Sequence, residues 1–282
     1  MQQPPREAGI DLANWNWKVV REFIKRRFAQ ELCRSTCLND LHRLGFVLRR
    51  PKKRLTKADV AKREEFVRLY AEVRQEAART GASIWFVDEA FFRADADLHG
   101  LWVLKGRPAL VDSSSPSLKE KVVSYSAVCL ETGEVEKMEV EGTCTAETSV
   151  AFLRQLRANH PEALIVIWDN GPAHRGDALR TYLATPDLRV RLVPLPGYSP
   201  DYNADEAIWG WVREDVTANT CLGTKGKVRE KVGAFLNGLS TRADEVKRRC
   251  RTALQAQADA LTNAATELIQ VPQHVDSTLA SL

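Results

Sequence analysis

Two aspartates interrupt apolar segments of the chain in a way that suits metal binding. Asp88 lies within SIWFVDEAFF (83–92), and Asp169 follows the apolar run of ALIVIWDNG (163–171). A carboxylate in an apolar strand is unfavourable unless a partner compensates it. If the two strands are neighbours, their axes lie about 4.8 Å apart, so both carboxylates can bind one divalent cation instead of repelling each other. Oxygen ligands with open water positions favour Mg²⁺ or Mn²⁺.

A third carboxylate stands where turn residues give way to a helical pattern, in PLPGYSPDYNADEAIWGWV (194–212). Two metal ions about 3.5–4 Å apart need a third acid, and Glu206 is the candidate. The alternative is a capping box, with Asn203 as the N-cap and Glu206 reaching back to it, while Asp205 favours the helix dipole. The two roles nearly exclude each other for one side chain, so geometry must decide between them.

The segments around these acids resemble the three catalytic blocks of a known family. WFVDEAFF, VIWDNGPAH and PLPGYSPDYNADEAIWGWV are similar to those of DDE transposases, in the bacterial insertion-sequence branch of the mariner-like superfamily. Matched residue by residue, the catalytic and metal-binding acids are Asp88, Asp169 and Glu206. The last two are separated by 36 residues (206 − 169 − 1). The resemblance covers 83–215 strongly and 15–55 loosely.

The resemblance implies an RNase H-like α/β fold, in which the first and fourth strands are adjacent. It implies two Mg²⁺ or Mn²⁺ ions per site and cut-and-paste transposition, with cleavage of the transposon ends and strand transfer into target DNA, usually at TA. The implied partners are double-stranded DNA, as terminal inverted repeats and target, and a second copy of the chain, because two ends must be joined.

The chain departs from the family pattern in three places. Ala204 replaces a proline, and Asp205 replaces a residue that is usually apolar. Family members usually carry another helix-turn-helix upstream, so we expect either a truncated N-terminal module here or the downstream half of a split reading frame. Two other functions therefore remain open: a catalytically inactive DNA-binding remnant that acts as a regulator, and a host nuclease with the same fold.

Four further residues are candidates for auxiliary roles in the site. His174 is similar to the family's histidine and could reach the scissile phosphate or orient Asp169; a surface residue is the alternative. Asn170 is either a ligand or, more simply, a turn former. Lys105 and Arg107 could steer DNA, or they are ordinary solvated loop charges.

The charge of the chain is unevenly distributed. Residues 1–80 hold 19 Lys and Arg against 10 Asp and Glu, a balance of +9, and the rest hold 22 against 27, a balance of −5. Between Arg43 and Lys57 there are seven basic residues and no acid. By itself, this asymmetry fits either a polyanion-binding front end or a solvated run of charges. The helix-turn-helix pattern next to the basic run favours polyanion binding.

The front end has the pattern of a winged helix-turn-helix. Residues 17–30 predict an amphipathic helix, and Ser35 can cap a second helix that Gly45 closes. A basic extended segment follows. The second helix would enter the major groove and the basic segment would hold phosphates; a helical hairpin packed on the rest is the alternative. The candidate DNA contacts are Arg34, Thr36, Asn39 and Arg43 on the helix, and Arg49, Arg50, Lys52, Lys53 and Arg54 beyond it.

The remaining pattern predicts a mixed sheet flanked by helices. Strands are expected at 83–92, 101–110 and 163–171 and in a hairpin with its turn at 131–134, with helices between and after them. We therefore expect a winged helix-turn-helix domain at 1–55, a linker helix at 56–80 and an RNase H-like catalytic domain at 81–282.

Several protein classes are excluded by composition. No apolar run approaches the roughly 20 residues that span a bilayer, and the first residues lack a signal-peptide pattern. The six cysteines form no CxxC pair and no zinc-binding pattern. We expect reduced thiols in a cytoplasmic bacterial protein that associates with the nucleoid when it is bound to DNA, with no membrane partner.

The basic front end leads to a first prediction. Its binding to double-stranded DNA should weaken steeply as salt is raised from about 50 to 200 mM, because Lys and Arg release counterions from phosphates. Fluorescence anisotropy of labelled DNA measures the dissociation constant at each salt concentration. An affinity that does not change over this range would contradict the prediction.

Overall fold

The computed structural model describes residues 4–12, 14–48, 59–113 and 120–270. Its contacts divide the chain into two compact units, 1–54 and 55–282. None of the helices in the described ranges combines the length and apolarity that crossing a bilayer requires.

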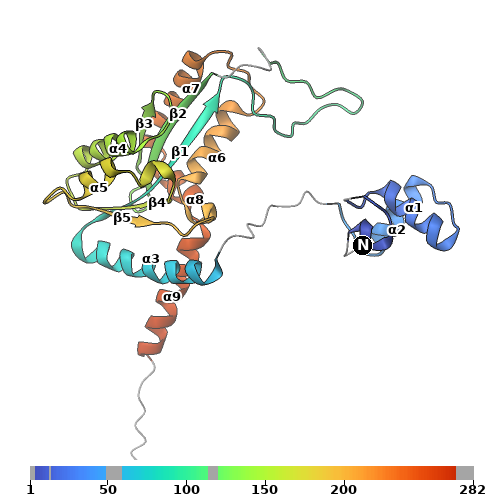
Figure 1. Cartoon of the computed structure of the whole chain (residues 1–282), viewed down its shortest axis with the longest axis horizontal. Helices are drawn as coiled ribbons and strands as arrows, with labels where there is room; N and C mark the ends of the chain where they lie inside the picture. Colours follow the sequence, from blue (N-terminus) through green and yellow to red (C-terminus); the bar gives the residue numbers. More distant parts are fainter. Residues whose placement is uncertain (1–3, 13, 49–58, 114–119, 271–282) are drawn as a thin grey trace, which may run out of the picture. The chain divides into compact units, whose positions relative to one another are not determined.

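The first unit contains two packed helices, α1 (Trp17–Phe28) and α2 (Arg34–Arg43), after a 3₁₀ turn, Pro5–Ala8 (Figure 1). The side chain of Asn16 caps α1, because its Oδ1 accepts hydrogen bonds from the backbone amides of Lys18 and Val19. The N-cap of α2 is Cys33, whose sulfur accepts from the amide of Thr36, so the prediction of Ser35 in this role was wrong. Ser35 lies inside the first turn, where its hydroxyl instead contacts the Cys33 sulfur.

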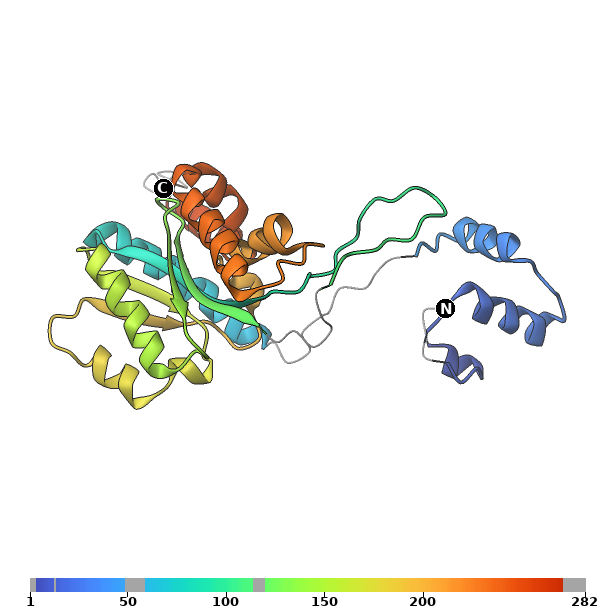
Figure 2. The same ribbon diagram turned by 90° about the horizontal axis from the view of Figure 1, so that it is seen from above.

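The second unit is built on a five-stranded mixed sheet with the order β3-β2-β1-β4-β5 (Figures 1 and 2). Strand β1 pairs with β2 antiparallel and with β4 parallel, β2 pairs with β3 antiparallel, and β4 pairs with β5 parallel. The strands are β1 (Ser83–Arg93), β2 (Lys121–Cys129), β3 (Val135–Val140), β4 (Leu164–Trp168) and β5 (Val190–Pro194). This arrangement confirms the predicted mixed sheet and the adjacency of the first and fourth strands.

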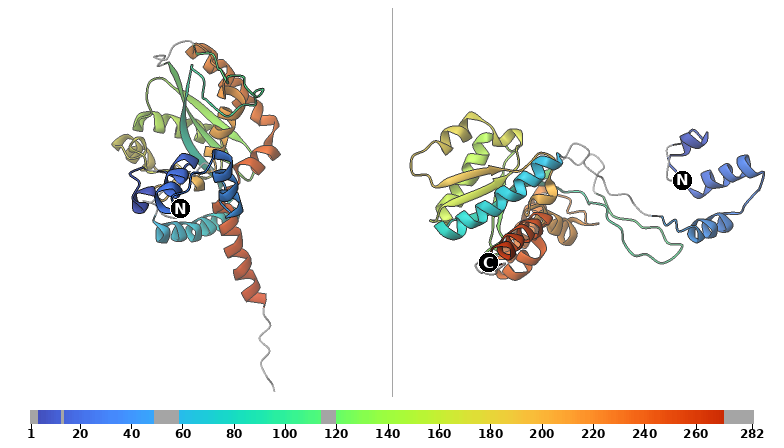
Figure 3. Two further views of the ribbon diagram at one scale, coloured as in Figure 1. Left: turned by 90° about the vertical axis from the view of Figure 1, so that its right-hand side faces the viewer. Right: turned by 90° about the horizontal axis from the view of Figure 1, so that it is seen from below.

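Helices cover both faces of the sheet (Figures 2 and 3). The side chains of β1 alternate between the two cores. From β1, Trp85 and Val87 pack on one face, and Phe86 and Ala90 pack on the other. The first face is covered by α4 (Ala146–Asn159) and α5 (Asp177–Leu183). The second is covered by α3 (Val60–Thr80), α6 (Glu206–Val212), α7 (Lys225–Gly238), α8 (Ala243–Cys250) and α9 (Ala253–Gln270).

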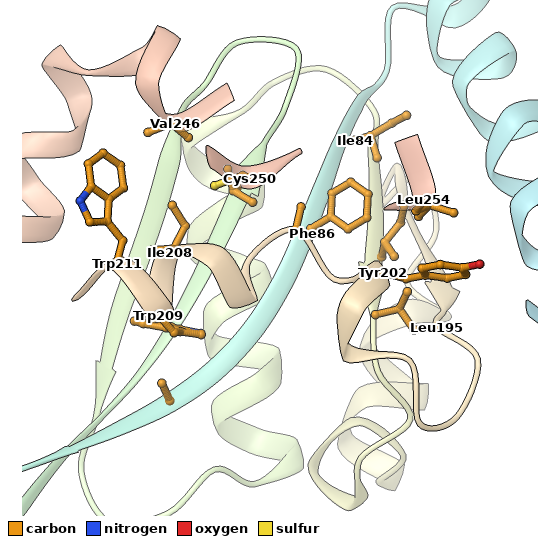
Figure 4. Packing of buried hydrophobic residues seen from close by; sticks show 14 of the residues in the cluster. Ile84, Phe86, Leu195, Tyr202, Ile208, Trp209, Trp211, Val246, Cys250 and Leu254 are labelled. Carbon is orange, nitrogen blue, oxygen red and sulfur yellow. The ribbon is translucent and has the colours of Figure 1, made fainter. Parts of the chain in front are cut away.

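The second core holds α6 in place through two buried indoles, Trp209 and Trp211, and Ile208 (Figure 4). Burying one such side chain contributes about 1.5–3 kcal/mol. Helix α3 packs against α9 and contributes Phe66 and Tyr70 to the same core. The helix expected as a linker therefore packs as part of the larger unit.

Two predictions about the sheet had different outcomes. The hairpin turn at 131–134 is confirmed, because the amide of Gly133 donates to the carbonyl of Cys129 at 2.8 Å between β2 and β3. The strand expected at 101–110 was wrong: the segment is an exposed loop that leaves the sheet after β1 (Figure 2). Both sides of β1 are occupied by β2 and β4, and the segment pairs with no other strand of the sheet. Its β propensity alone does not form a strand.

The hairpin turn leads to a prediction about stability. Gly133 has φ +79°, and a Cβ there would lie 2.8 Å from the carbonyl carbon of Ala243. Gly133→Ala should therefore destabilise the fold by about 1–2 kcal/mol from the left-handed backbone and by about 1–3 kcal/mol more from the clash. Urea unfolding measures the free energy.

Gly142→Ala is the matched control, because Gly142 has φ +91° and no atom within 4 Å of its added Cβ. It should show the backbone term alone. Equal losses in the two variants would mean that the contact with Ala243 is unimportant.

Candidate active site

The two aspartates lie at neighbouring places in the sheet. Strands β1 and β4 run parallel with Phe86 opposite Ile167. Asp88 follows Phe86 by two residues in β1, and Asp169 follows Ile167 by two residues just beyond the end of β4. The strand pairing therefore carries both carboxylates to one level of the sheet.

Glu206 is the first residue of α6, which excludes the alternative capping box with Asn203 as N-cap. The N-cap is Asp205 and makes no side-chain capping hydrogen bond. The Asn203 side chain instead donates to the carbonyl of Val87 at 2.9 Å and accepts from the amide of Asp205 at 3.1 Å. Glu206 thus has no capping role that would compete with ligand binding.

All three acids line a single pocket of about 580 Å³. The rest of its wall comes from the loop after β4 and from the Pro-Gly turn after β5, including Asn170, Arg175, Tyr198 and Asn203. Sequence reasoning missed Arg175, which brings a positive charge to an otherwise acidic pocket; its only signal was its position directly after His174.

The acids repel one another across the pocket. Burial, followed by the charges of Asp205 and Glu206, raises the pKa of Asp88 to about 9. Burial also raises the pKa of Glu206, with Asp169 and Glu89 adding to the effect and Arg213 opposing it. Burial and the neighbouring acids therefore disfavour the ionised form of these carboxyls without metal, and a bound cation would favour it.

The donors fit a divalent cation of the Mg²⁺ or Mn²⁺ class. They are carboxylate oxygens on the wall of an open pocket, which is the ligand type that these ions prefer. Within the described residues, no three Asp, Glu, His or Cys side chains are grouped so that they could hold a metal ion by themselves. A cation in this pocket would complete its coordination with water and substrate oxygens.

His174 is buried behind Asp169. Its Nε2 lies 3.3 Å from Asp169 Oδ1 and 3.2 Å from Glu89 Oε2, and its Nδ1 lies 3.3 Å from Ser149 Oγ. The imidazole also stacks on Trp168, with 4.0 Å between ring centroids. This geometry favours a role in orienting Asp169, which stays a prediction. Glu89 points to the opposite face of β1 from Asp88, yet its carboxylate reaches this histidine.

The other predicted residues lie in different places. Asn170 lines the pocket and donates to the Leu195 carbonyl at 3.4 Å, as a turn residue would. Lys105 and Arg107 lie in the exposed loop and are not part of the pocket wall. On α2, the exposed candidates are Arg34, Thr36, Asn39 and Arg43. The basic residues Arg49, Arg50, Lys52, Lys53 and Arg54 lie outside the described residues.

Comparisons with known proteins agree with this geometry. Residues 83–229 match the family described as DDE superfamily endonuclease, and residues 13–70 match the winged helix-turn-helix family. The "Insertion element IS630 uncharacterized 39 kDa protein" of Shigella sonnei is 22% identical over 242 residues, which is 85% of this chain and 69% of that protein.

Solved structures share the fold. The "Mos1 transposase paired-end complex with left transposon end" is similar with a TM-score of 0.59 and 15% identity, covering 89% of this chain and 81% of that one. The "Mos1 mariner paired end complex with Mn" has a TM-score of 0.58 and 16% identity, with the same coverage. The predicted RNase H-like fold is thereby confirmed. Because the endonuclease match covers more than half of the sequence and includes all three pocket acids, the chain belongs to the DDE superfamily of endonucleases, enzymes that cleave DNA by phosphoryl transfer.

Proposed function

We propose that this protein is a DNA transposase that cuts the ends of a mobile element and joins them to target DNA. The observation that carries the proposal is the meeting of Asp88, Asp169 and Glu206 on one pocket, although the first and the last lie 118 positions apart in the chain (206 − 88). Similar structures are titled as transposon-end and strand-transfer complexes of Mos1, and two name Mn or Mg. Those titles support a divalent-metal enzyme acting on DNA ends.

In this proposal the three carboxylates are the ligands and His174 orients one of them. Two bound Mg²⁺ or Mn²⁺ ions would supply the charge that activates the attacking oxygen and stabilises the leaving oxygen. Water is the nucleophile when each end is cut, and the freed 3′-hydroxyl is the nucleophile when the end joins target DNA, at TA by analogy with the family. In both steps the oxygen nucleophile attacks phosphorus directly and a DNA oxygen leaves, so no side chain needs to form a covalent bond with DNA.

Arg175 supports this assignment of substrate. It is exposed at the mouth of a pocket whose other charged residues are the three acids. A phosphodiester that approaches these acids needs a positive neighbour, and a guanidinium can hold two phosphate oxygens at once. We assign Arg175 to the phosphate backbone next to the bond that is cut.

The first unit would read the DNA ends. We propose residues 1–55 as the winged helix-turn-helix domain, with the exposed polar face of α2 in the major groove and the basic segment after it on phosphates. Residues 56–80 would be the linker helix between the two domains, and its helix α3 packs on the catalytic domain at 81–282. A dimer would hold two ends for joining, in the bacterial cytoplasm and on the nucleoid.

The assignment of the acids predicts a separation of cleavage from binding. Asp88→Ala and Asp169→Ala should each abolish Mg²⁺-dependent nicking of the element's ends, because each removes a metal ligand, and each should bind those ends as wild type does. Gel assays of nicking and of complex formation measure the two activities.

Asp112→Ala, at an exposed carboxyl of the loop before β2 that does not line the pocket, is the matched control and should cut normally. Full cleavage by either pocket variant would remove the assignment of these acids. Binding by wild type without any cleavage would favour the regulatory remnant, and cleavage without strand transfer would favour a host nuclease.

A second prediction concerns stability without metal. The pKa of Asp88 is raised to about 9, whereas an aspartate in an unfolded chain titrates near 3.9. Unfolding therefore releases a proton between these pH values, and the contribution of Asp88 to stability is present below about pH 4 and lost as the pH rises through 9. Asp88→Asn should lack this loss.

The measurement is urea unfolding in EDTA from pH 5 to 9. The stability of Asp88→Asn relative to wild type should increase with pH, and added Mg²⁺ should stabilise wild type more than the variant. A difference between the two proteins that stays constant with pH would contradict the burial of this carboxyl. Asp112→Asn, at an exposed position, should follow wild type throughout.

A further inference from the structure

The start of α6 is held by buried polar contacts that the proposed chemistry does not use. Asp205 is the residue just before Glu206 and has an exposed fraction of 0%. It does not line the pocket, and it does not cap the helix with its side chain. A carboxyl in such surroundings is unfavourable unless hydrogen bonds compensate it, so its partners indicate its role.

One partner comes from the strand next to Asp88. Asp205 Oδ2 accepts a hydrogen bond from Ser126 Oγ, and Ser126 is equally buried. In the antiparallel pairing of β1 with β2, Ser126 is the residue directly opposite Asp88. Residues that face each other in this way have their side chains on the same side of the sheet. The contact therefore ties the helix start to the immediate neighbour of the first pocket acid.

A second connection reaches β1 itself. The amide of Asp205 donates to Asn203 Oδ1 at 3.1 Å, and Asn203 Nδ2 donates to the carbonyl of Val87 at 2.9 Å. Val87 directly precedes Asp88. The start of α6 is thus joined to both strands at the level of Asp88. The side chain of Asp205 reaches β2 through Ser126, and the amide of Asp205 is linked to β1 through Asn203.

Glu206 depends on these connections because its helix is short. Helix α6 has seven residues, a length at which helical structure comes from packing and end contacts and not from propensity. Packing of Ile208 and Trp209 fixes the middle of the helix, whereas the contacts of Asp205 fix its first turn. A shift of about 1 Å in a reacting group can reduce a rate by about 100-fold.

We propose that Asp205 is a positioning residue, which acts with Ser126 and Asn203 to fix the first turn of α6 so that Glu206 takes its place in the pocket with Asp88 and Asp169. The inference rests on the proposed function of that pocket. Its basis is hydrogen bonding and shape and not the charge of Asp205, so an asparagine can replace it.

The test compares Asp205→Asn, Asp205→Ala, Ser126→Ala and the double variant Asp205→Ala/Ser126→Ala in the full chain. Asparagine keeps the size and the acceptor oxygen, whereas alanine removes the partner of the Ser126 hydroxyl. Ser124→Ala is the matched control: Ser124 is a buried serine on the same face of β2, and it lines a separate cavity beside α7.

Three readouts are needed: amide hydrogen exchange of the segment 198–212, affinity for Mn²⁺ by electron paramagnetic resonance without DNA, and the rate of nicking. Asp205→Ala should speed exchange at the start of α6, weaken Mn²⁺ binding and reduce nicking by about 10- to 100-fold, with DNA binding and exchange in α4 unchanged. Asp205→Asn and Ser124→Ala should stay within about threefold of wild type in every readout.

Ser126→Ala should act in the same direction as Asp205→Ala, and the double variant should be no worse than Asp205→Ala alone, because the two residues act through one contact. Wild-type exchange and Mn²⁺ affinity in both Asp205→Ala and Ser126→Ala would overturn the proposal, as would an asparagine variant as impaired as the alanine variant. If Asp205→Ala fails to fold, Ser126→Ala alone decides through the same readouts.

The outcome also separates this inference from the proposed function. A wild-type protein that cuts no DNA with any divalent metal would refute the transposase assignment. The exchange and Mn²⁺ measurements would still decide whether Asp205 fixes the first turn of α6.

Discussion

The parallel pairing of β1 with β4 is the constraint on which the site depends. It sets Phe86 opposite Ile167 and thereby places Asp88 and Asp169 at the same level of adjacent strands. Strand β5, which pairs with β4 in parallel, ends at Pro194 on the same side and leads the chain towards α6. Glu206 can reach the pocket because the chain leaves β5 at the same end of the sheet where Asp88 and Asp169 lie. A different strand order would separate the three acids.

The apolar packing that stabilises the fold around the pocket also disfavours the ionised form of the pocket acids. The core that buries Trp209 and Ile208 contributes about 1.5–3 kcal/mol for each large side chain. The same exclusion of water raises the pKa values of Asp88 and Glu206. The fold therefore keeps in place a group of carboxylates that would be less costly in water. On the other face of the sheet, the His174 ring packs against Trp168 and lies between the carboxylates of Asp169 and Glu89. There too, polar groups are held within apolar packing.

The sequence was informative where a local pattern has one solution. Apolar runs predicted β1 and β4, the turn at Gly133 predicted the β2–β3 hairpin, and the motif resemblance predicted which strands are neighbours. It was not informative where distant partners decide. Residues 101–110 have strand-forming side chains but pair with no strand of the sheet. The first residue of α6 is set by contacts of Asn203 and Asp205 with β1 and β2, and these contacts cannot be read from the NADE segment itself.

The central strand pair also has a consequence for how the protein comes into being. Ser83 pairs with Leu164, which lies 81 positions later in the sequence (164 − 83). Contacts between such distant positions form slowly because a long loop must close first. Glu206 follows another 42 residues later (206 − 164). A nascent chain emerging from a ribosome therefore cannot assemble the three acids until most of it has been synthesised, and incomplete translation products lack the arrangement needed to cleave DNA.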